Sequence, residues 1–312
     1  MTLAEAYLEC RAIAKREAKN FYYAFLALPR AKSDAMCAVY AFMRRADDLA
    51  DDESLTIPER REAMAGWTAA WRASRSGATD DPVFLALNDT QQRFNIPDEL
   101  LEQLVQGTTL DLDPEPPGTE AVGVYTSRGT EIVRTYSTED DLYDYCYLVA
   151  SVVGLVCIRI FGYSNPRAEE LAENTGIAFQ LTNILRDVKE DLLRFRCYLP
   201  MIMMRAHIEH PEHLIRVALG EAKFDKRDRQ MMMMFAEDAM AFYQSAEQLI
   251  PMIDADSRAG LWVLVRIYFE LLNTIYKADG DVFSERRSVP TRKKLAILAQ
   301  GMVLSAWYRV RG

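Results

Sequence analysis

The stretch 176–192 constrains this chain more than any other, because it predicts a helix with two separate faces. At 100° per residue, its apolar residues gather on one arc, and its small and polar residues gather within about a quarter turn of one another. The polar arc consists of Gly176, Gln180, Asn183, Asp187 and Asp191. An amide and two carboxylates thus stand one turn apart in a row. Hard oxygen ligands of this kind suit Mg²⁺, and they suit Zn²⁺ poorly without His or Cys. A solvated acidic face is the alternative.

A second stretch, 36–52, weakens that alternative. Its apolar stripe Met36, Tyr40 and Met43 steps by three or four residues, and the same stripe continues as Asp47 and then Asp51. Burial of an unpaired carboxylate is costly, so a cation is expected beside these two. Two such helices facing each other would hold divalent ions between them, and a diphosphate would fill the open coordination sites.

Composition bounds the class of protein. The chain has 312 residues, of which 50% are hydrophobic, with only 14 Gly and 12 Pro, as in an ordinary globular protein with a sizeable core. A net charge of −9 argues against nucleic acid as a partner. The five cysteines are an odd number without a C-x-x-C spacing, which indicates buried thiols in a reducing compartment.

The sequence also predicts the compartment. Glu5, Glu9 and Arg11 lie in the first turns, which is not the pattern of a signal peptide. The longest apolar run, 148–158, is broken by Arg159 and is too short to span a bilayer. We expect a cytoplasmic protein that contacts membranes only at their surface, on the inner face.

Caps and prolines place the helices. Thr2 with Glu5 predicts a first helix start, and Pro58, Pro82 and Pro97 predict three more. The segment 113–127 is rich in Pro and Gly and predicts a long loop, either disordered or a flap near a site. Period-two strands, a Gly-rich phosphate loop and long repeats are not evident. We therefore predict an all-α fold, a single domain over 1–312 built as a helical bundle around a central hydrophobic cavity.

Two further segments leave alternatives open. The apolar helix predicted over 142–161 contains Gly154, where a neighbouring helix or, less commonly, a hydrocarbon could approach closely. Aromatic residues around Phe21 and Phe25 predict either core or a pocket wall. His207, His210 and His213 have regular spacing, but Pro211 interrupts the helix that would align them, so we do not expect a metal site there.

Two acidic helices facing an aromatic cavity suggest the ionisation of an allylic diphosphate. Metal ions and cationic side chains would neutralise the departing diphosphate. The remaining carbocation needs a dry wall with electron-rich aromatic faces, because water would quench it.

The chain resembles a known family, the squalene/phytoene synthases, over almost its whole length. The motifs that carry the resemblance are Phe21-Tyr-Tyr-Ala-Phe-Leu26, Tyr40-Ala-Phe, Arg44-Arg-Ala-Asp-Asp-Leu-Ala-Asp51, Tyr145-Cys-Tyr, Val149-Ala-Ser-Val-Val-Gly154, 180–191, Tyr198-Leu-Pro200, Asp281-Val-Phe-Ser-Glu-Arg286 and Pro290-Thr291. The resemblance implies an isoprenoid-synthase-like helical fold, prenyl diphosphate substrates and Mg²⁺.

Residue roles follow from the resemblance, motif by motif. It implies catalytic roles for Asp47, Asp51, Asp187, Asp191, Tyr40 and Tyr145. The implied Mg²⁺ ligands are Asp47, Asp48, Asp51, Asn183, Asp187 and Asp191. The implied diphosphate-binding residues are Arg44, Arg45, Arg186, Arg286 and Gln180, and the implied hydrocarbon pocket is Phe21, Phe25, Val149, Val153 and Gly154.

The family joins two prenyl diphosphates head to head through a cyclopropylcarbinyl diphosphate. Squalene synthases reduce the rearranged cation with NADPH, phytoene synthases lose a proton, and some bacterial members stop at presqualene diphosphate. Those members leave later steps to partner enzymes of the isoprenoid pathway. Motifs 22–25 and 149–154 look closest to hopanoid-associated bacterial members, which favours farnesyl diphosphate and presqualene diphosphate, with squalene or hydroxysqualene as onward products.

Alternatives remain. A phytoene synthase would use two geranylgeranyl diphosphates, a class I terpene cyclase would fold one prenyl chain, and an assembly-factor relative would not be an enzyme. The chain also departs from the family pattern: Phe195 replaces the usual Gly between two arginines, Cys197 replaces the second arginine, and Gly280 replaces a frequent Tyr. The segment 113–127 looks like an insertion. These departures concern the second half-reaction and leave the first intact.

Overall fold

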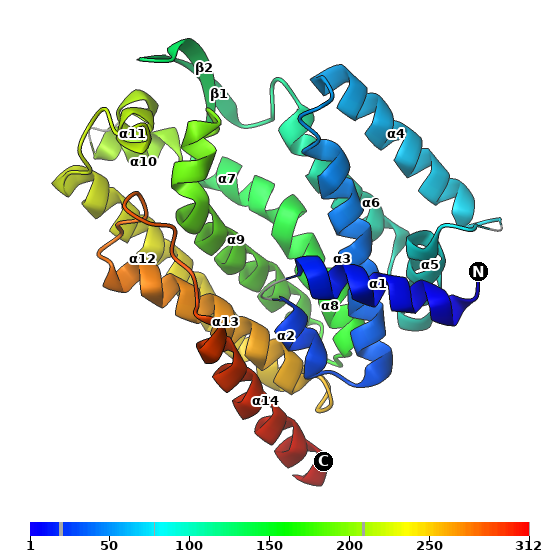
Figure 1. Ribbon diagram of the computed structural model, residues 1–312. Helices are drawn as coiled ribbons and strands as arrows, with labels where there is room; N and C mark the ends of the chain where they lie inside the picture. The colour runs from blue at the N-terminus through cyan, green and yellow to red at the C-terminus, as the bar shows by residue number, and fades with distance from the viewer. Residues whose placement is uncertain (19–20, 78, 208–209, 312) are drawn as a thin grey trace.

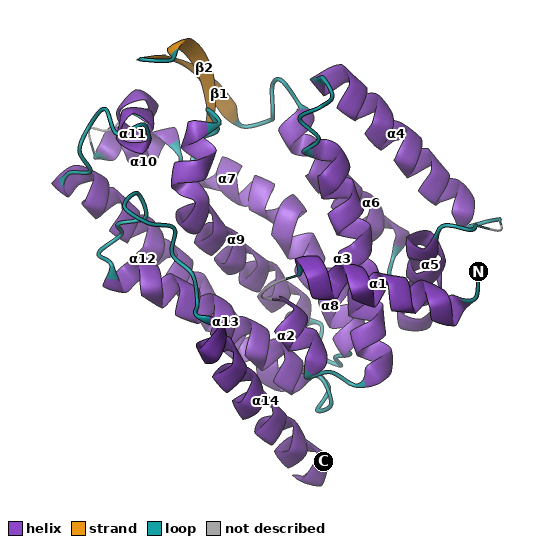
Figure 2. Ribbon diagram, in the orientation of Figure 1, coloured by secondary structure: helices purple, strands orange, loops and turns teal. Residues whose placement is uncertain are grey.

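The computed structural model describes residues 1–18, 21–77, 79–207 and 210–311, and it is all-α apart from one β-hairpin, as Figures 1 and 2 show. The predicted all-α bundle is confirmed. The α-helices are α1 (Leu3–Glu17), α2 (Phe21–Leu26), α3 (Arg30–Ala50), α4 (Ile57–Ser74), α5 (Pro82–Phe94), α6 (Asp98–Thr109), α7 (Glu139–Cys146), α8 (Val152–Phe161), α9 (Arg167–Leu193), α10 (Met201–Ala206), α11 (Pro211–Ala218), α12 (Lys226–Leu249), α13 (Arg258–Lys277) and α14 (Thr291–Arg311). Short helical turns are η1 (Leu110–Leu112), η2 (Tyr147–Ser151) and η3 (Ile250–Met252).

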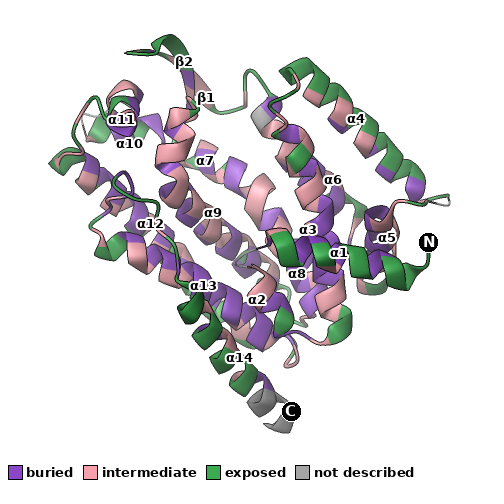
Figure 3. Cartoon of the chain, in the orientation of Figure 1, coloured by how far each residue is buried: buried purple, intermediate pink, exposed green. Residues whose placement is uncertain are grey.

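The helices surround α8 and α9, which run through the middle of the molecule. Helices α12 and α13 lie against one side of α9, and α3 and α6 lie against α8 on the other side (Figure 1). Buried residues concentrate on the faces that point toward this centre (Figure 3). One contiguous cluster of buried apolar side chains joins most of the helices, so the two acidic motifs are carried on a single packed body.

Local signals fix where the helices begin. Reciprocal capping boxes satisfy the first backbone N–H groups of α1, α4, α7 and α12; they pair Thr2 with Glu5, Thr56 with Glu59, Thr138 with Asp141, and Asp225 with Asp228. Pro58 lies in the first turn of α4, Pro82 begins α5, and α6 follows Pro97. The predicted helix starts at these prolines are confirmed.

The helix expected over 142–161 begins earlier and contains an irregular turn. Helix α7, the π-helical turn η2 and α8 form one stretch of 23 residues, Glu139–Phe161, which by length and composition could cross a membrane. It is longer than the apolar run that the sequence suggested, and 56% of its most apolar window is buried within the fold. We interpret it as a core helix. Single π-helical turns occur often at functional sites, and η2 supplies part of the pocket wall described below.

Glycines let α8 and α9 approach closely. A Cβ at Gly176 would lie 2.5 Å from the Cα of Ser151, and a Cβ at Gly154 would lie 2.9 Å from the carbonyl oxygen of Ala172. Both distances are far below van der Waals contact, so neither position accommodates a side chain without a shift. A neighbouring helix therefore occupies the space beside Gly154.

The segment predicted as a structureless loop contains a strand, so that prediction was wrong. Strands β1 (Thr119–Thr126) and β2 (Gly129–Tyr136) form an antiparallel hairpin that projects beside α11. Val124 and Val133 are fully buried, and the backbone N–H of Tyr125 donates to the Glu212 carboxylate at 3.0 Å.

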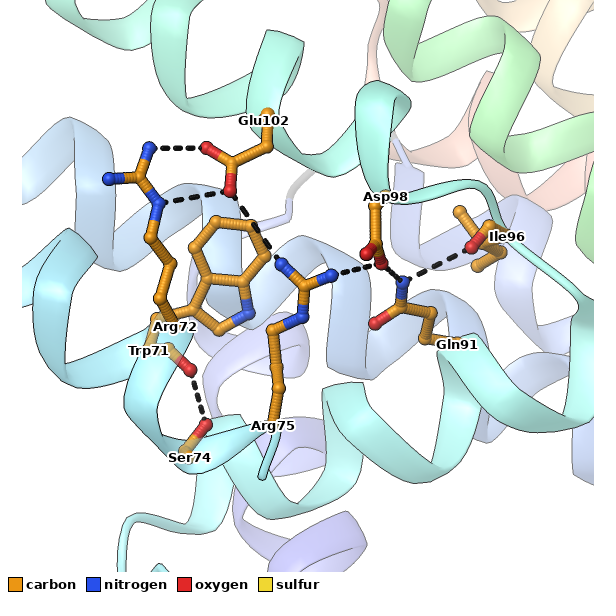
Figure 4. A network of polar contacts seen from close by, with 8 residues as sticks. All are labelled: Trp71, Arg72, Ser74, Arg75, Gln91, Ile96, Asp98 and Glu102. Atoms are coloured by element: carbon orange, nitrogen blue, oxygen red, sulfur yellow. Dashed lines mark hydrogen bonds and ion pairs between the residues drawn. The ribbon is translucent and has the colours of Figure 1, made fainter. Parts of the chain in front are cut away.

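Helix α4 packs at the edge of the molecule through the buried ring of Trp71, and surface ion pairs connect it to α6 (Figure 4). Trp71 is fully buried, and the Arg75 guanidinium lies 5.2 Å from its ring centroid. Arg72 contacts Glu102 at 2.6 Å, and Arg75 also contacts Asp98. Exposed pairs of this kind contribute little individually, so the apolar face of α4, with Trp71, Met64 and Trp67, carries most of this attachment.

Candidate functional site

A pocket of about 280 Å³ lies between α2, α3, η2, α8, α9, α13 and the end of α12. The wall residues named here are Phe21, Phe25, Met36, Tyr40, Met43, Arg44, Asp47, Val149, Val153, Gly154, Phe161, Thr175, Gly176, Phe179, Gln180, Asn183, Leu249, Leu261, Leu264 and Tyr268. Apart from tyrosines, the polar side chains of the wall come from the two acidic helices: Arg44 and Asp47 from α3, and Thr175, Gln180 and Asn183 from α9. Almost all of the remaining wall is apolar or aromatic. Asp47 of the first stripe and Gly176, Gln180 and Asn183 of the second therefore face one shared hollow.

The periodicity of α3 explains its contribution. Met36, Tyr40, Met43 and Asp47 step by three or four residues, and all four line the pocket. Met36, Tyr40 and Met43 therefore lie on the same face of α3 as the carboxylate of Asp47, as the spacing in the sequence predicts.

Both acidic motifs also lie at the carboxyl-terminal ends of their helices. Helix α3 ends at Ala50 with Asp51 as its cap, and Asp187 and Asp191 lie in the last two turns of α9. The helix dipole makes the last turn of each helix negative, so Asp47 on α3 and Asp191 on α9 are unfavourable there by roughly 0.3–1 kcal/mol each unless a cation balances them. Two helices that both break this preference beside one pocket indicate a site for positive charge.

On α9, arginines supply part of that charge. Asp187 accepts hydrogen bonds from the Nε of Arg186 at 2.9 Å and from the Nε of Arg286 at 2.9 Å. Burial alone would raise the pKa of the Asp187 carboxyl, but these two guanidinium groups hold the pKa below its ordinary value. Arg286 comes from the segment between α13 and α14 and also lies 3.6 Å from the Glu190 carboxylate. The carboxylate is therefore ionised and already faces two cations.

On α3, one arginine nitrogen lacks a partner. Arg44 contacts Asp48 at 2.5 Å through its terminal nitrogen, while its buried Nε has no hydrogen-bond acceptor among the described residues. Tyr40 lies one turn earlier on the same face, and burial raises its pKa to about 12. At neutral pH this hydroxyl keeps its proton, so Tyr40 and Arg44 both offer hydrogen-bond donors to an anion in the pocket.

The residues at the polar end fit Mg²⁺. Asn183 lines the pocket, and its buried Oδ1 accepts no hydrogen bond within the described part of the chain. An orphaned buried acceptor is costly and calls for a ligand. Amide and carboxylate oxygens without His or Cys form the donor set that Mg²⁺ prefers. Asp187 and Asp191 stand one and two turns further along α9, outside the wall of the pocket itself.

Four more residues of the predicted site, Arg45, Asp48, Asp51 and Tyr145, lie outside the pocket wall. Arg45 is directed to the cap of α5, where its terminal nitrogen contacts both oxygens of Asp81 at 2.8 and 2.6 Å. Tyr145 is buried and stacks on Tyr198 with 5.3 Å between ring centroids. Neither lines the pocket. Asp51 is exposed just beyond α3, and Asp48 is half-exposed beside Arg44.

The five residues predicted to form a hydrocarbon wall share this pocket with aromatic residues that the sequence did not indicate. Phe21, Phe25, Val149, Val153 and Gly154 all line the pocket. Phe179 and Tyr268 line it too, with their rings stacked at 4.4 Å. Phe179 directly precedes Gln180 in the polar arc, which was an available signal. Tyr268 lies within an apolar helix that gives no such signal.

The three histidines do not share a site. His207 lies near the Met203 carbonyl, His210 caps α11, and His213 pairs with the buried Asp228 at 3.2 Å. His213, Asp225 and Asp228 could by distance hold an ion, but the two aspartates already form the capping box of α12. None of these residues lines the pocket.

Comparisons with known proteins agree with this geometry. A sequence model described as "Squalene/phytoene synthase" matches residues 14–293. The chain is 33% identical to a 15-cis-phytoene synthase of Synechococcus elongatus, over 97% of this chain and 94% of that protein. It is 32% identical to a phytoene synthase of Mycobacterium tuberculosis, over 97% and 92%.

Solved structures share the fold. A dehydrosqualene synthase bound to a ligand superimposes with a TM-score of 0.77 at 27% identity, over 96% of both chains. A squalene synthase from Alicyclobacillus acidocaldarius superimposes with a TM-score of 0.74 at 23% identity, over 89% of this chain and 95% of that one. At that identity the second likeness concerns the fold alone.

Proposed function

The chain belongs to the squalene/phytoene synthase family of prenyltransferases, and we propose that it condenses two farnesyl diphosphates head to head, C1′ to C1, into presqualene diphosphate with release of diphosphate. One observation carries this proposal. At the polar end of an otherwise apolar pocket, α3 presents an orphaned donor, Arg44 Nε, and α9 presents an orphaned acceptor, Asn183 Oδ1, among the residues described. A diphosphate and a divalent cation would satisfy both groups.

The polar residues bind and orient the diphosphate end of the substrate. Mg²⁺, held by Asp47, Asn183 and the neighbouring Asp187, would neutralise the negative charge that develops on the leaving diphosphate. Arg44 and the protonated Tyr40 donate hydrogen bonds to the same anion. Arg286, from the segment between α13 and α14, is close enough to Asp187 to share this task.

The apolar residues protect the cation that remains. The rings of Phe21, Phe179 and Tyr268 line the pocket and are packed together, with the ring centroids of Phe21 and Tyr268 5.6 Å apart; aromatic rings of this kind stabilise a nearby cation. The wall around them excludes water, so the second prenyl double bond is the available nucleophile. Carbon–carbon bond formation followed by proton loss then gives the cyclopropyl product.

Bulk in the apolar wall favours the shorter substrate. Phe25 and Phe161, both about 2% exposed, line the pocket together with Leu249 and Leu261. Four large side chains there leave less room for a C20 chain than for a C15 chain. The likeness to a dehydrosqualene synthase supports the same preference.

A second candidate is a phytoene synthase that uses two geranylgeranyl diphosphates. The names of the curated relatives at 32–33% identity favour it. A terpene cyclase and a non-enzymatic assembly factor have no comparable support, because the relatives are synthases and both acidic motifs are retained.

Product analysis tests the proposal. The purified protein is incubated with Mg²⁺ and either the C15 or the C20 diphosphate, with and without NADPH, and products are identified by mass spectrometry. We expect a C30 diphosphate from farnesyl diphosphate. A C40 hydrocarbon formed only from the C20 substrate would establish the second candidate, and a product with the carbon count of one substrate would indicate a cyclase. Onward formation of squalene would require the arms with NADPH, whereas hydroxysqualene, formed by addition of water to the cation, would appear with or without it.

Metal dependence has its own readout. Calorimetric titration of the protein with pyrophosphate in the presence of Mg²⁺ measures the affinity of the site for both. Asn183→Leu should weaken this binding about tenfold, because the substitution removes the amide oxygen while keeping the side-chain volume. Equal affinity in the variant would exclude Asn183 as a ligand even if turnover were lost.

A further inference from the structure

Between residues 295 and 305, helix α14 carries apolar side chains on both of its faces. Ile297, Gly301 and Ser305 are buried against the body of the protein. The opposite face is exposed, with 52% of Leu295, 51% of Met302 and 71% of Val303 accessible to solvent. Exposed alanines at 296 and 299 complete a stripe at helical spacing.

Such a stripe is unusual at a free surface. A surface helix of a globular protein normally turns polar residues to solvent, and contiguous exposed apolar patches mark interaction sites. Figure 3 shows α14 at the outer edge of the molecule with its outward side exposed. The stripe therefore indicates a surface that another body covers.

The charge of α14 specifies what kind of body. Its sequence contains five Lys and Arg residues and no Asp or Glu, in a chain whose net charge is −9. Arg292 is exposed at its first turn, and Lys293 contacts Glu270 of α13. A second copy would bring two positive helices together, which like-charge repulsion opposes. An anionic lipid surface attracts the same charges and accepts the apolar stripe.

The position of α14 connects this face to the pocket. Helix α14 packs on α13 and on α2, the helices that carry Leu261, Leu264, Phe21 and Phe25 of the apolar wall. The contact with α13 is close, since a Cβ at Gly301 would collide with the side chain of Val263. The exposed stripe is thus one helix layer away from the hydrocarbon part of the pocket.

We propose that the outer face of α14, formed by Leu295, Ala296, Ala299, Met302 and Val303, docks the protein on an anionic bilayer. The interaction goes beyond the reaction itself, because it concerns where the protein works and stands independently of which prenyl chain it uses. The basic residues give the long-range attraction, and the apolar stripe inserts at the headgroup boundary.

Vesicle flotation tests the proposal with the full chain. Vesicles of phosphatidylcholine containing about 30 mol% phosphatidylglycerol should carry the wild type, and phosphatidylcholine alone should carry about tenfold less. Met302→Glu with Val303→Glu should reduce binding to the anionic vesicles at least about tenfold. Arg292→Gln with Lys294→Gln should reduce it severalfold, and raised salt should do the same.

A matched control comes from the hairpin. Tyr125 and Ile132 are exposed at 67% and 69%, close to the 71% of Val303, so Tyr125→Glu with Ile132→Glu removes two exposed apolar side chains elsewhere. This variant should float as the wild type does, and both variants should keep wild-type melting temperatures and pyrophosphate release in solution. The proposal is overturned if the wild type stays off anionic vesicles, or if the hairpin variant loses binding while the α14 variant keeps it. A stable dimer in sedimentation that the α14 substitutions dissolve, without vesicle binding, would instead make this face a contact between copies.

Discussion

The two acidic motifs differ in how much of their charge the fold itself balances. On α9, the Asp187 side chain is 23% exposed and contacts both Arg186 and Arg286. On α3, Arg44 contacts Asp48, whose side chain is 54% exposed. The α9 motif is therefore built into the packed structure, and the α3 motif lies at the edge of solvent.

Because of this difference, substitutions in the two motifs should affect stability unequally even where both affect binding. The Arg186 guanidinium is only 19% exposed, so it depends on the Asp187 carboxylate to offset its loss of water. A substitution on α9 should therefore disturb both the site and the stability. A substitution on α3 should disturb the site alone.

The largest expected effect is on turnover. Asp47→Asn and Asp187→Asn each remove a carboxylate from the proposed Mg²⁺-diphosphate cluster, and each should lower kcat about 100- to 1000-fold. Pyrophosphate release with farnesyl diphosphate measures this. Asp98→Asn, which alters an exposed ion pair with Arg75 far from the pocket, is the control and should retain full turnover. Full activity in either motif variant would remove that residue from the site.

The second effect is on the free energy of unfolding, and it should differ between substitutions in the α9 motif and in the α3 motif. Asp187→Asn leaves the largely buried Arg186 without its anion and should cost roughly 1–3 kcal/mol in the free energy of unfolding. Asp47→Asn should change it by less than about 0.5 kcal/mol. Urea unfolding followed by circular dichroism gives both numbers. Equal losses in the two variants would contradict the proposed division.

The pH dependence of that loss follows from the lowered pKa of Asp187. A carboxyl with a depressed pKa in the fold contributes stability that is fully present above its unfolded pKa of about 3.9, and this stability is lost as the pH falls through the folded value. The gap between wild type and Asp187→Asn should therefore be constant near neutral pH and narrow below about pH 4. Urea unfolding at a series of pH values checks this, and a gap that widened on acidification would contradict the ion-pair account.

A smaller effect is expected for Arg286→Gln. The Arg286 side chain is 50% exposed, so its loss should change stability by less than about 0.5 kcal/mol. Its removal from Asp187 should still weaken binding of Mg²⁺-pyrophosphate about three- to tenfold by calorimetry, because one diphosphate donor is lost. Arg45→Gln is the comparison on α3; Arg45 contacts Asp81 outside the pocket, so the same titration should give unchanged affinity.

The sequence predicted which residues share one face of a helix, because that information is periodic along the chain. The stripe from Tyr40 to Asp47 followed from spacing alone, and the same spacing distinguishes Arg44, one turn from Tyr40, from Arg45, which points about 100° away. Contacts between distant segments had no such signal, as with Arg286 and Asp187. The hairpin was missed because Tyr125 and Ile132 place apolar side chains on its outer face, which hides the alternation of a half-buried strand.

The smallest expected effect concerns the turns that follow the motifs. Helix α3 leaves through Asp51 with φ of −97°, whereas α9 is followed by Phe195 with φ of 58°, in the left-handed region that side chains disfavour by roughly 1–2 kcal/mol. Phe195→Gly and Phe195→Ala both remove the partly buried ring, so their difference isolates the backbone. The glycine variant should be more stable than the alanine variant by about 1 kcal/mol, the reverse of the order in an ordinary helix, as urea unfolding would measure. If the alanine variant is as stable as the glycine variant or more stable, the backbone at position 195 is not strained. The turn after α9 would then carry no more strain than the turn after α3.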